Sequence, residues 1–334
     1  MDRLHSMRVF AKVIDEGSFA SAARSLDLSA AVVTRLVADL EAHLGARLIQ
    51  RTTRRLALTD IGETYLERVR QILSEVEEAE ALASAAVADP KGHLRVLVPG
   101  AFAVHQLAKH LPKFRQQCPK VTVDLTAGSA IEAADEAYDV SILIVGPRPL
   151  SGDFVARKLA RTEVVACAAP SYLDQYGRPL RPEDLGGHEC LVANLPNAPR
   201  TWRFEGCPLG RPSADGIEVE PRAALTTHHI DTLYAAALAG LGIVGLPSFM
   251  VEDALLESAL ERVLPEWRIM SYTIYAAMPS RKYVPARTRA FMDFLVGTFG
   301  AEDRDPWLAA AGCETPYLHG DNTAAEAAGE RALA

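Results

Sequence analysis

The sequence predicts a multidomain chain: a small, mostly helical unit, then one long helix, then a two-lobed α/β domain. Three observations support this division. Apolar residues recur at helical spacing up to residue 45, an amphipathic pattern runs from residue 60 to about 88, and short apolar runs alternate with helical segments after Gly92. With 334 residues, of which 49% are hydrophobic, the chain can form two or three domains, each with its own core.

Three short helices are expected in the first part of the chain. Apolar residues from Leu4 to Ile14 form one stripe, and Gly17 ends that first helix. Ser18 and Ser29 can cap the second and third helices, because a serine hydroxyl accepts a hydrogen bond from an unpaired backbone N–H of the first turn. The third helix buries residues at positions i, i+4, i+7 and i+11, which are Val33, Val37, Leu40 and Leu44.

The opposite face of this third helix suits close entry into the DNA major groove, because its first turns carry small residues, one hydroxyl and one guanidinium. The candidate DNA-binding residues on the helix are Ser29, Ala30, Ala31, Thr34 and Arg35. After Gly45, two β-like stretches flank a basic cluster, which places the cluster at a hairpin tip, or wing, that can grip phosphates. The candidates there are Arg51, Thr53, Arg54 and Arg55. A solvated charged face is the weaker alternative, since helices, turn and hairpin follow in the required order.

Residues 1–60 therefore predict an all-α winged helix-turn-helix DNA-binding domain with double-stranded DNA as its partner. A specific series of residues also resembles a known family, and it comprises Gly17-Ser18-Phe19, Ala22-Ala23, Leu26, Leu28-Ser29, Val33-Thr34-Arg35, Leu40-Glu41, Leu44-Gly45, Arg51-Thr52-Thr53-Arg54, Leu58-Thr59 and Gly62. The chain is similar to the LysR-type transcriptional regulators, and the similarity extends weakly to about residue 300. It implies a sequence-specific regulator whose periplasmic-binding-protein-like effector domain holds a small molecule.

Two departures from the family pattern affect base recognition. Leu36 stands where many members carry a glutamine, and Ala30 and Ala31 replace frequent glutamine or proline residues. We therefore expect base readout to depend on Arg35 and on DNA shape.

The net charge of −8 conceals an asymmetry that agrees with DNA binding. Residues 1–60 carry a net charge of +2, whereas the remainder carries −10. Phosphate is thus attracted to one domain and repelled by the rest, and binding should depend strongly on salt. The N-terminus lacks the apolar core of a signal peptide and no run of 18 apolar residues occurs, so we expect a cytoplasmic protein without membrane association.

The apolar pattern of residues 61–89 predicts a linker helix that also mediates dimerisation. Its apolar residues follow a spacing close to a heptad: Leu66, Val69, Leu73 and Val76. Such a long helix is expected to lack a partner in its own small domain. Pairing with a second copy is the simplest way to bury its apolar face, and packing on the C-terminal domain is the alternative. We expect a homodimer or a tetramer, in which a pair of copies would place two recognition helices on two half-sites. RNA polymerase is a further expected partner if the protein activates transcription.

The effector domain is expected at residues 90–300. Lobe I comprises about residues 93–162 and 269–300, and lobe II comprises about residues 163–268. The expected strands are His93–Val98, Val121–Thr126, Val140–Val145, Glu163–Ala168, Ile243–Leu246 and Tyr272–Ala277. The expected helices are Ala103–Gln117, Ile131–Ala137, Asp231–Ala239 and Pro285–Phe299. Residues 301–334 are rich in alanine, glycine and acids, and predict a poorly ordered tail.

Ligands in open α/β sheets bind beyond the carboxyl ends of the strands, so the effector candidates are residues that follow the predicted strands. They are Gly100, Ala101, Phe102, Ser129, Arg148, Thr227 and His228. Backbone N–H groups at helix starts favour an anion, and Arg148 could add a bidentate carboxylate contact. Ala101 falls where many members of the family place a serine or threonine, which weakens a direct transfer of carboxylate binding.

Other chemistries find little support. The glycine pattern from Gly240 to Gly245 follows a predicted helix, whereas a dinucleotide fingerprint must follow a strand, so Gly240 is interpreted as a helix cap. His228-His229 lacks further ligands at metal-binding spacing, and no cofactor is expected. The five cysteines form no CxxC pair; a regulatory disulfide between Cys190 and Cys207 is conceivable, but buried thiols are the simpler interpretation. No catalytic motif indicates an enzyme; a solute-binding module with an oligomerisation helix is the alternative function.

Overall fold

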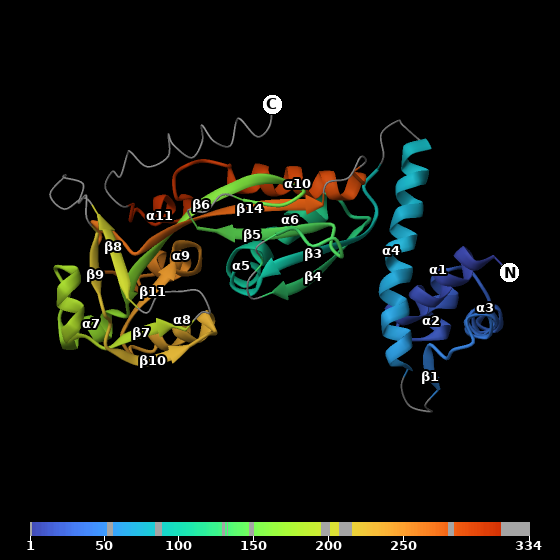
Figure 1. The fold of residues 1–334 in the computed structure, drawn as a ribbon, viewed down its shortest axis with the longest axis horizontal. Coiled ribbons are helices and arrows are strands. Elements are labelled where there is room, and N and C mark those ends of the chain that lie inside the picture. Colours follow the sequence, from blue (N-terminus) through green and yellow to red (C-terminus); the bar gives the residue numbers. More distant parts are fainter. Residues whose placement is uncertain are drawn as a thin grey trace. The chain divides into compact units, whose positions relative to one another are not determined.

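The computed structural model describes residues 2–51, 56–83, 89–128, 131, 133–146, 150–194, 201–206, 216–279 and 284–314. The chain forms two compact units, one of Met1–Asp89 with Tyr283–Pro285, and one of the remaining residues. Figure 1 shows the elements of each unit. No helix within the described ranges is long and apolar enough to cross a membrane.

The first unit contains the three predicted helices and a two-stranded hairpin. Its elements are α1 (Arg3–Asp15), α2 (Phe19–Ser25), α3 (Ala30–Leu44), β1 (Ile49–Arg51), β2 (Leu56–Leu58) and α4 (Asp60–Ala83). Both predicted serine caps are present, since Ser18 accepts from the Ser21 N–H and Ser29 from the Val32 N–H. Gly45 ends α3 in the left-handed conformation at φ +66°. Phe10 and the predicted stripe residues Val33, Val37 and Leu40 are at most 2% exposed and form the core. Leu44, the fourth residue predicted for this stripe, is 38% exposed at the end of α3, so the prediction is wrong for that residue.

The long helix α4 does have a partner in its own unit, so that part of the prediction is wrong. Leu66 and Val69, the first two residues of the expected dimer stripe, are buried in the core of the first unit. The ring of Tyr65 lies 6.0 Å from that of Phe10 on α1. The hairpin returns the chain to the start of α4, and the first turns of that helix therefore cover α1. Ile72 remains 39% exposed.

The second unit is built on a mixed sheet for which the described residues supply nine strands, in the order β10-β7-β11-β6-β14-β5-β3-β4, with β12 beside β6. These strands are β3 (Gly92–Pro99), β4 (Val121–Gly128), β5 (Val140–Val145), β6 (Phe154–Ala168), β7 (Cys190–Ala193), β10 (Ala223–Thr227), β11 (Ile243–Pro247), β12 (Glu261–Arg262) and β14 (Met270–Pro279). A smaller sheet contains β8 (Trp202–Gly206), β9 (Ile217–Val219) and β13 (Trp267–Arg268). All six predicted strands of this domain are present.

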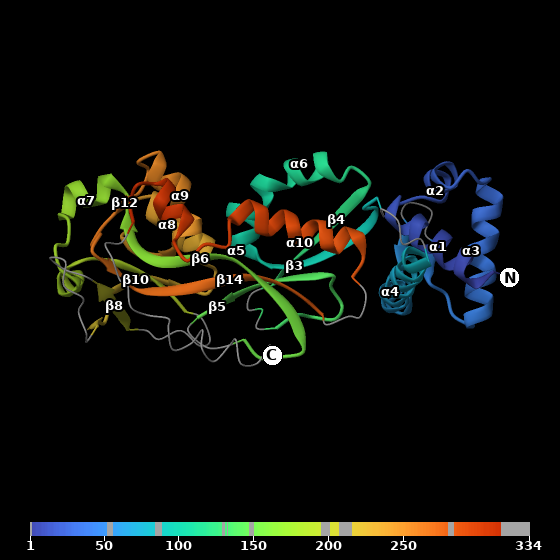
Figure 2. The ribbon, with the colours of Figure 1, turned by 90° about the horizontal axis from the view of Figure 1, so that it is seen from above.

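Helices cover these sheets. They are α5 (Gly100–Phe102), the π-helical turn η1 (Ala103–Leu107), α6 (Ala108–Gln117), α7 (Pro170–Tyr176), the 3₁₀ turn η2 (Pro182–Gly187), α8 (Ile230–Leu238), α9 (Ser248–Leu256), α10 (Ala286–Phe299) and α11 (Pro306–Ala310). Helix α10 lies along β6 and beside α6, as Figure 2 shows from above. The helices predicted from Ala103, Asp231 and Pro285 are therefore confirmed, the first with a π-helical turn in its course.

Two long antiparallel strands, β6 and β14, join the two lobes. Residues 273–277 of β14 pair with β5 on one side and with residues 156–161 of β6 on the other, so this part of β6 lies level with β5. Residues 164–167 of β6 pair with β11. We call β3, β4, β5, α5, η1, α6 and α10 the first lobe, and β7, β10, β11, β12, α7, α8 and α9 the second lobe. The sheet is continuous through both lobes, and the crossing lies at residues 162 and 163 of β6.

The helix predicted at Ile131–Ala137 is absent from the described residues of that stretch, which form turns instead. The carboxylate of Asp135 accepts a hydrogen bond from the Ala137 N–H at 2.8 Å, and the Asp135 N–H donates to Ser141 Oγ. An aspartate that bonds the backbone two residues later favours a turn over a helix. The alanine-rich composition therefore misled the helix prediction.

The predicted disorder beginning at residue 301 is wrong for residues 301–314. Helix α11 starts at Pro306, and its side chains Trp307 and Leu308 are 4% and 1% exposed within the main core. Burial of these two apolar side chains offsets the conformational entropy that ordering the segment costs. Residues 315–334, with Tyr317 and Leu318, lie outside the described part.

The interpretation of Gly240 as a helix cap agrees with the structure. Gly240 follows α8 with φ +78°, a conformation that favours glycine. Gly242 lies where a Cβ would overlap the carbonyl oxygen of Glu189, and Gly245 lies within β11. These glycines therefore allow a turn and close backbone packing between a helix and a strand.

Candidate DNA-binding surface and effector cleft

The first turns of α3 present the surface that the sequence predicted for DNA. Ser29, Ala30, Ala31 and Thr34 are exposed, while Thr34 Oγ1 donates to the Ala30 carbonyl at 2.8 Å. Small side chains at this end allow the helix axis to approach a surface closely. The first turns are free of acidic residues, so the positive end of the helix dipole faces outward unopposed.

Arg35 is the long cationic side chain on this face. Its side chain is 82% exposed, and its Nε lies 3.8 Å from the carboxylate of Asp39 one turn later. An exposed pair at this distance is weak, so the guanidinium can turn to a phosphate or a base edge at little cost.

The wing is the antiparallel pair of β1 and β2, in which Arg51 lies opposite Leu56. Thr53, Arg54 and Arg55 lie outside the described residues, and of Arg51 only the backbone is described. The paired strands show that the chain reverses direction between these two positions. The two β-like stretches that the sequence predicted on either side of the basic cluster are therefore present as paired strands.

Two polar residues that the sequence reasoning did not assign to the site fix the wing onto the helices. Glu41 Oε1, on α3, accepts hydrogen bonds from the backbone N–H groups of Leu48 and Ile49 at 2.8 and 3.1 Å. Thr59 Oγ1 donates to the carbonyl of Arg47 at 2.7 Å and accepts from the Gly62 N–H. The family resemblance included both residues, but their spacing alone did not indicate these long-range bonds.

Replacing Glu41 by alanine is expected to lower the free energy of unfolding of the first unit by about 1–3 kcal/mol, because two partly buried N–H groups lose their acceptor. Glu41→Gln retains an acceptor oxygen and should lose less. Urea unfolding followed by far-UV circular dichroism measures both changes. Glu67→Ala, an exposed glutamate on α4, is the control, and an equal effect of Glu67→Ala and Glu41→Ala would contradict the anchoring role.

The described candidates of the first lobe, Gly100 and Ala101, follow the carboxyl end of β3, which lies beside the parallel strand β4. Pro99 at the end of β3 pairs with Gly128 at the end of β4, and Gly100 begins α5 directly afterwards. Ala101 is 6% exposed. Ser129 and Arg148 lie outside the described residues.

Phe102 does not belong with these cleft candidates. Its side chain is fully buried, and its ring centroid lies 5.4 Å from those of Phe249 and Phe299 and 6.4 Å from that of Trp307. Its position on an interior face of α5 explains the error, because the sequence shows that a residue follows a strand but not which way its side chain turns. Phe102 is a core residue.

The candidates of the second lobe lie at the end of β10, the strand at the opposite end of the sheet from β4. Thr227 ends β10, and its Oγ1 accepts from the His229 N–H at 3.1 Å. His228 is exposed. The sheet order therefore assigns Thr227 and His228 to a different lobe from Gly100 and Ala101.

Polar contacts between the lobes were not anticipated from the sequence. His105 Nε2 in η1 lies 2.7 Å from a carboxylate oxygen of Asp231 in α8. Gln106 donates to the carbonyl of Phe249 at 2.8 Å, and Lys109 forms an ion pair with Asp253 at 2.7 Å. These residues are more than 120 positions apart in each pair, so no local pattern could reveal them. They connect the first helical segment of one lobe with α8 and α9 of the other.

Among the cysteines, Cys190 is a core residue and its burial raises the pKa of the thiol to about 12. Cys167 is equally buried, and burial raises its pKa to about 12 as well. Because the thiolate is the reactive form, both thiols are unsuited to oxidation in the folded protein. Cys207, the other half of the conceivable disulfide, lies outside the described residues.

We expect Cys167 and Cys190 to resist a water-soluble disulfide reagent at pH 8 until the protein unfolds. At that pH the thiolate fraction is on the order of 1 in 10,000 for a pKa near 12, and access is blocked in addition. Mass spectrometry of labelled peptides, with and without guanidinium chloride, measures the reaction. Rapid labelling of Cys190 in the native protein would contradict its burial and restore a redox role.

Comparison with known proteins agrees with the division into two parts. Residues 4–63 match the bacterial regulatory helix-turn-helix protein model of the lysR family, and residues 87–300 match the LysR substrate binding domain model. The HTH-type transcriptional regulator PtxR of Pseudomonas aeruginosa is 32% identical over 300 residues, which cover 90% of this chain and 94% of PtxR. The regulator CrgA of Neisseria meningitidis serogroup B is 33% identical over 296 residues, covering 88% and 96%.

Solved structures show the same architecture. The structure of CrgA from Neisseria meningitidis has 30% sequence identity and a TM-score of 0.55, covering 89% of this chain and 98% of that one. The full-length virulence activator AphB of Vibrio cholerae has 23% identity and a TM-score of 0.55, and it supports the fold. From the helix-turn-helix, the two-lobed domain and these matches, we conclude that the chain belongs to the LysR family of transcriptional regulators.

Proposed function

We propose that this regulator reads DNA with the first turns of α3 and holds the flanking phosphates with the wing. The observation that carries the proposal is the exposed face of Ser29, Ala30, Ala31 and Thr34 beside the exposed side chain of Arg35. Arg51, Thr53, Arg54 and Arg55 would add phosphate contacts, because guanidinium groups bind phosphate oxygens bidentately. No part of this role requires catalysis or a cofactor, and we propose that the protein is not an enzyme.

Two arginine variants separate base reading from phosphate binding. Arg35→Ala should cost about 1–3 kcal/mol of binding free energy and relax the preference for the cognate site. Arg54→Ala should weaken binding nearly uniformly across sequences and reduce the slope of log K against log salt by about one. Fluorescence anisotropy with DNA from the region upstream of the gene, at several salt concentrations, measures both effects.

The control for these titrations is Arg181→Ala, which removes the same charge from an exposed position in the second unit. It should leave both affinity and salt slope unchanged. If neither Arg35→Ala nor Arg54→Ala weakened binding more than Arg181→Ala, the proposed roles would be excluded. Ligand binding without any DNA binding would favour a solute-binding module instead.

We further propose that the regulator acts as a homodimer, or as a tetramer built from dimers, and works in the cytoplasm. Leu66 and Val69 are committed to the first unit, so pairing through α4 would use the residues that remain outside that core, including the exposed Ile72. Two copies would present two recognition helices to two half-sites. RNA polymerase would be a partner if the regulator activates transcription.

The effector would bind between the lobes, against Gly100, Ala101 and Ser129 from one lobe and Thr227 and His228 from the other. Arg148 would pair with a carboxylate of the effector. Backbone N–H groups at the start of α5 favour an acidic ligand. Such a ligand would change the lobe angle and, through α4, the spacing of the recognition helices. Footprinting on the upstream DNA with candidate organic acids tests this, and unchanged footprints and scattering profiles at saturation would exclude it.

A further inference from the structure

Residues 301–314 contact β6 at residue 163, where the chain passes from one lobe to the other, and they also contact both lobes on either side of that point. The matched LysR substrate binding domain ends at residue 300, so this segment lies beyond the part that the family model describes. On the first-lobe side, the Ala301 N–H donates to the carbonyl of Leu159 at 2.9 Å, and Asp303 forms an ion pair with Lys158. Both partners belong to the portion of β6 that lies level with β5.

At the crossing itself, the carboxylate of Asp305 binds four donors. Its Oδ2 accepts from the Glu163 N–H at 2.7 Å and from Ser248 Oγ at 2.6 Å, and its Oδ1 accepts from the N–H groups of Trp307 and Leu308. Glu163 lies on β6, and Ser248 begins α9 of the second lobe. Burial raises the pKa of the Asp305 carboxyl to about 6, so these bonds only partly offset the loss of hydration.

The ring of Trp307 continues the connection within the apolar core. It lies 6.4 Å from Phe102 and 6.2 Å from Phe299, both of the first lobe, and 5.8 Å from Phe249 of the second lobe. An aromatic side chain that contacts two lobes at once resists their separation, because any opening exposes its surface to water.

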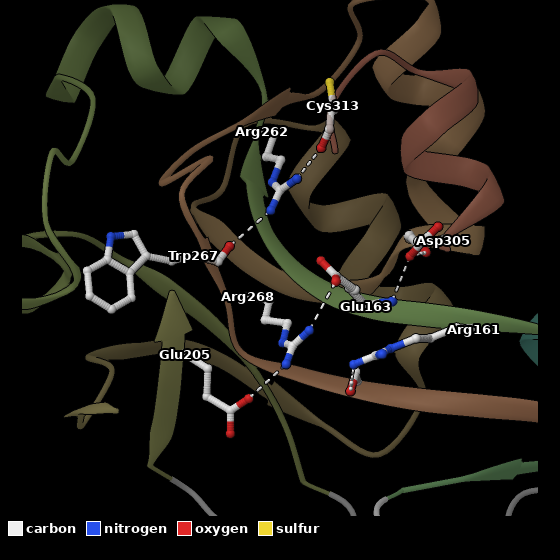
Figure 3. Close-up of polar contacts among 10 residues, drawn as sticks. Arg161, Glu163, Glu205, Arg262, Trp267, Arg268, Asp305 and Cys313 are labelled. Atoms are coloured by element: carbon white, nitrogen blue, oxygen red, sulfur yellow. Dashed lines mark hydrogen bonds and ion pairs between the residues drawn. The ribbon is translucent and has the colours of Figure 1, made fainter. Parts of the chain in front are cut away.

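The end of the segment is fastened to the second lobe. Arg262 of β12 donates one hydrogen bond to the carbonyl of Cys313 and another, at 3.0 Å, to that of Trp267 (Figure 3). Six residues after Arg262, the buried Arg268 forms ion pairs with Glu163 and with Glu205, each with an N···O distance of 3.3 Å. Figure 3 shows both contacts. Arg262 and Arg268 are 8% and 3% exposed, so the attachment point lies in the interior of the second unit.

We propose that residues 301–314 form a strap that ties the two lobes together at the point where β6 and β14 pass from one lobe to the other. The strap limits rotation of one lobe against the other. A ligand that changes the lobe angle must therefore work against the contacts of Asp305 and Trp307. This role concerns the effector domain alone and does not depend on DNA binding.

Hydrogen–deuterium exchange of the full-length protein tests the strap, with Trp307→Ala and the milder Asp305→Asn as variants. The decisive readout is α8, which faces His105 across the lobes through Asp231 and is distant in sequence from the strap contacts. If the strap holds the lobes, exchange in α8 should accelerate by about tenfold in either variant, because sub-global opening becomes easier. Arg304→Ala, an exposed position in the same segment, should leave α8 unchanged.

Two results would exclude the strap. If exchange accelerated only in residues 301–314 and in the neighbours that they touch directly, the segment would be a local plug and the strap would be excluded. Exchange that stayed unchanged throughout would exclude it as well. Asp305→Asn keeps the side-chain volume, so it supplies the answer even if Trp307→Ala does not fold.

Discussion

Gly62→Ala should destabilise the first unit by about 3 kcal/mol or more, because the new methyl group has no space. A Cβ at residue 62 would overlap the carbonyl oxygen of Leu48 and lie 2.9 Å from its carbonyl carbon. Both atoms are backbone, so they cannot rotate away as a side chain could. The Gly62 N–H also donates to Thr59 Oγ1, which ties the start of α4 to the wing. We therefore expect loss of DNA binding together with loss of helical structure.

Urea unfolding followed by two signals can measure this change within the full chain. All three tryptophans, Trp202, Trp267 and Trp307, belong to the second unit, so fluorescence reports on that unit alone, whereas far-UV circular dichroism reports on both. Gly62→Ala should shift the dichroism transition of the first unit to lower urea and leave the fluorescence transition in place. Gly297→Ala, in an open position of α10, is the matched control and should stabilise slightly, by about 0.5–1 kcal/mol. Normal stability of Gly62→Ala would contradict the close packing.

Phe102→Ala should cost the second unit about 3–5 kcal/mol, the usual range for removing a fully buried phenyl ring. The cavity would open among Phe249 of α9, Phe299 of α10 and Trp307 of α11. Tryptophan fluorescence should therefore show both an earlier unfolding transition and a changed native spectrum. The dichroism transition of the first unit should not move.

Val104→Ala is the control for this second variant, because Val104 lies two residues along and is 63% exposed. Its effect should stay within about 0.5 kcal/mol. If Phe102→Ala kept full stability but lost an effector that the parent protein binds, the ring would contact the effector and its assignment to the core would be wrong.

Patterns within a few residues were sufficient to predict the first three helices. The caps Ser18 and Ser29 and the stop at Gly45 depend on backbone N–H groups and φ angles in their own turn, and the structure contains all three. The apolar spacing of Val33, Val37 and Leu40 likewise determines one helix face without reference to the rest of the chain. The exposed face with Arg35 follows from the same periodicity.

The sequence by itself determined the order of the units, most of their helices and strands, and the family, because each depends on local periodicity or on a contiguous motif. Only the tertiary structure decided that Leu66 and Val69 cover α1, that Phe102 points into the core and that Trp307 joins both lobes. These outcomes depend on side chains that are far apart in the chain, such as Phe10 with Tyr65 and Phe102 with Trp307. Such contacts arise from the burial of apolar surface, which is non-directional and favours any apolar partner that the folded backbone brings near. They therefore leave no pattern in the neighbouring sequence.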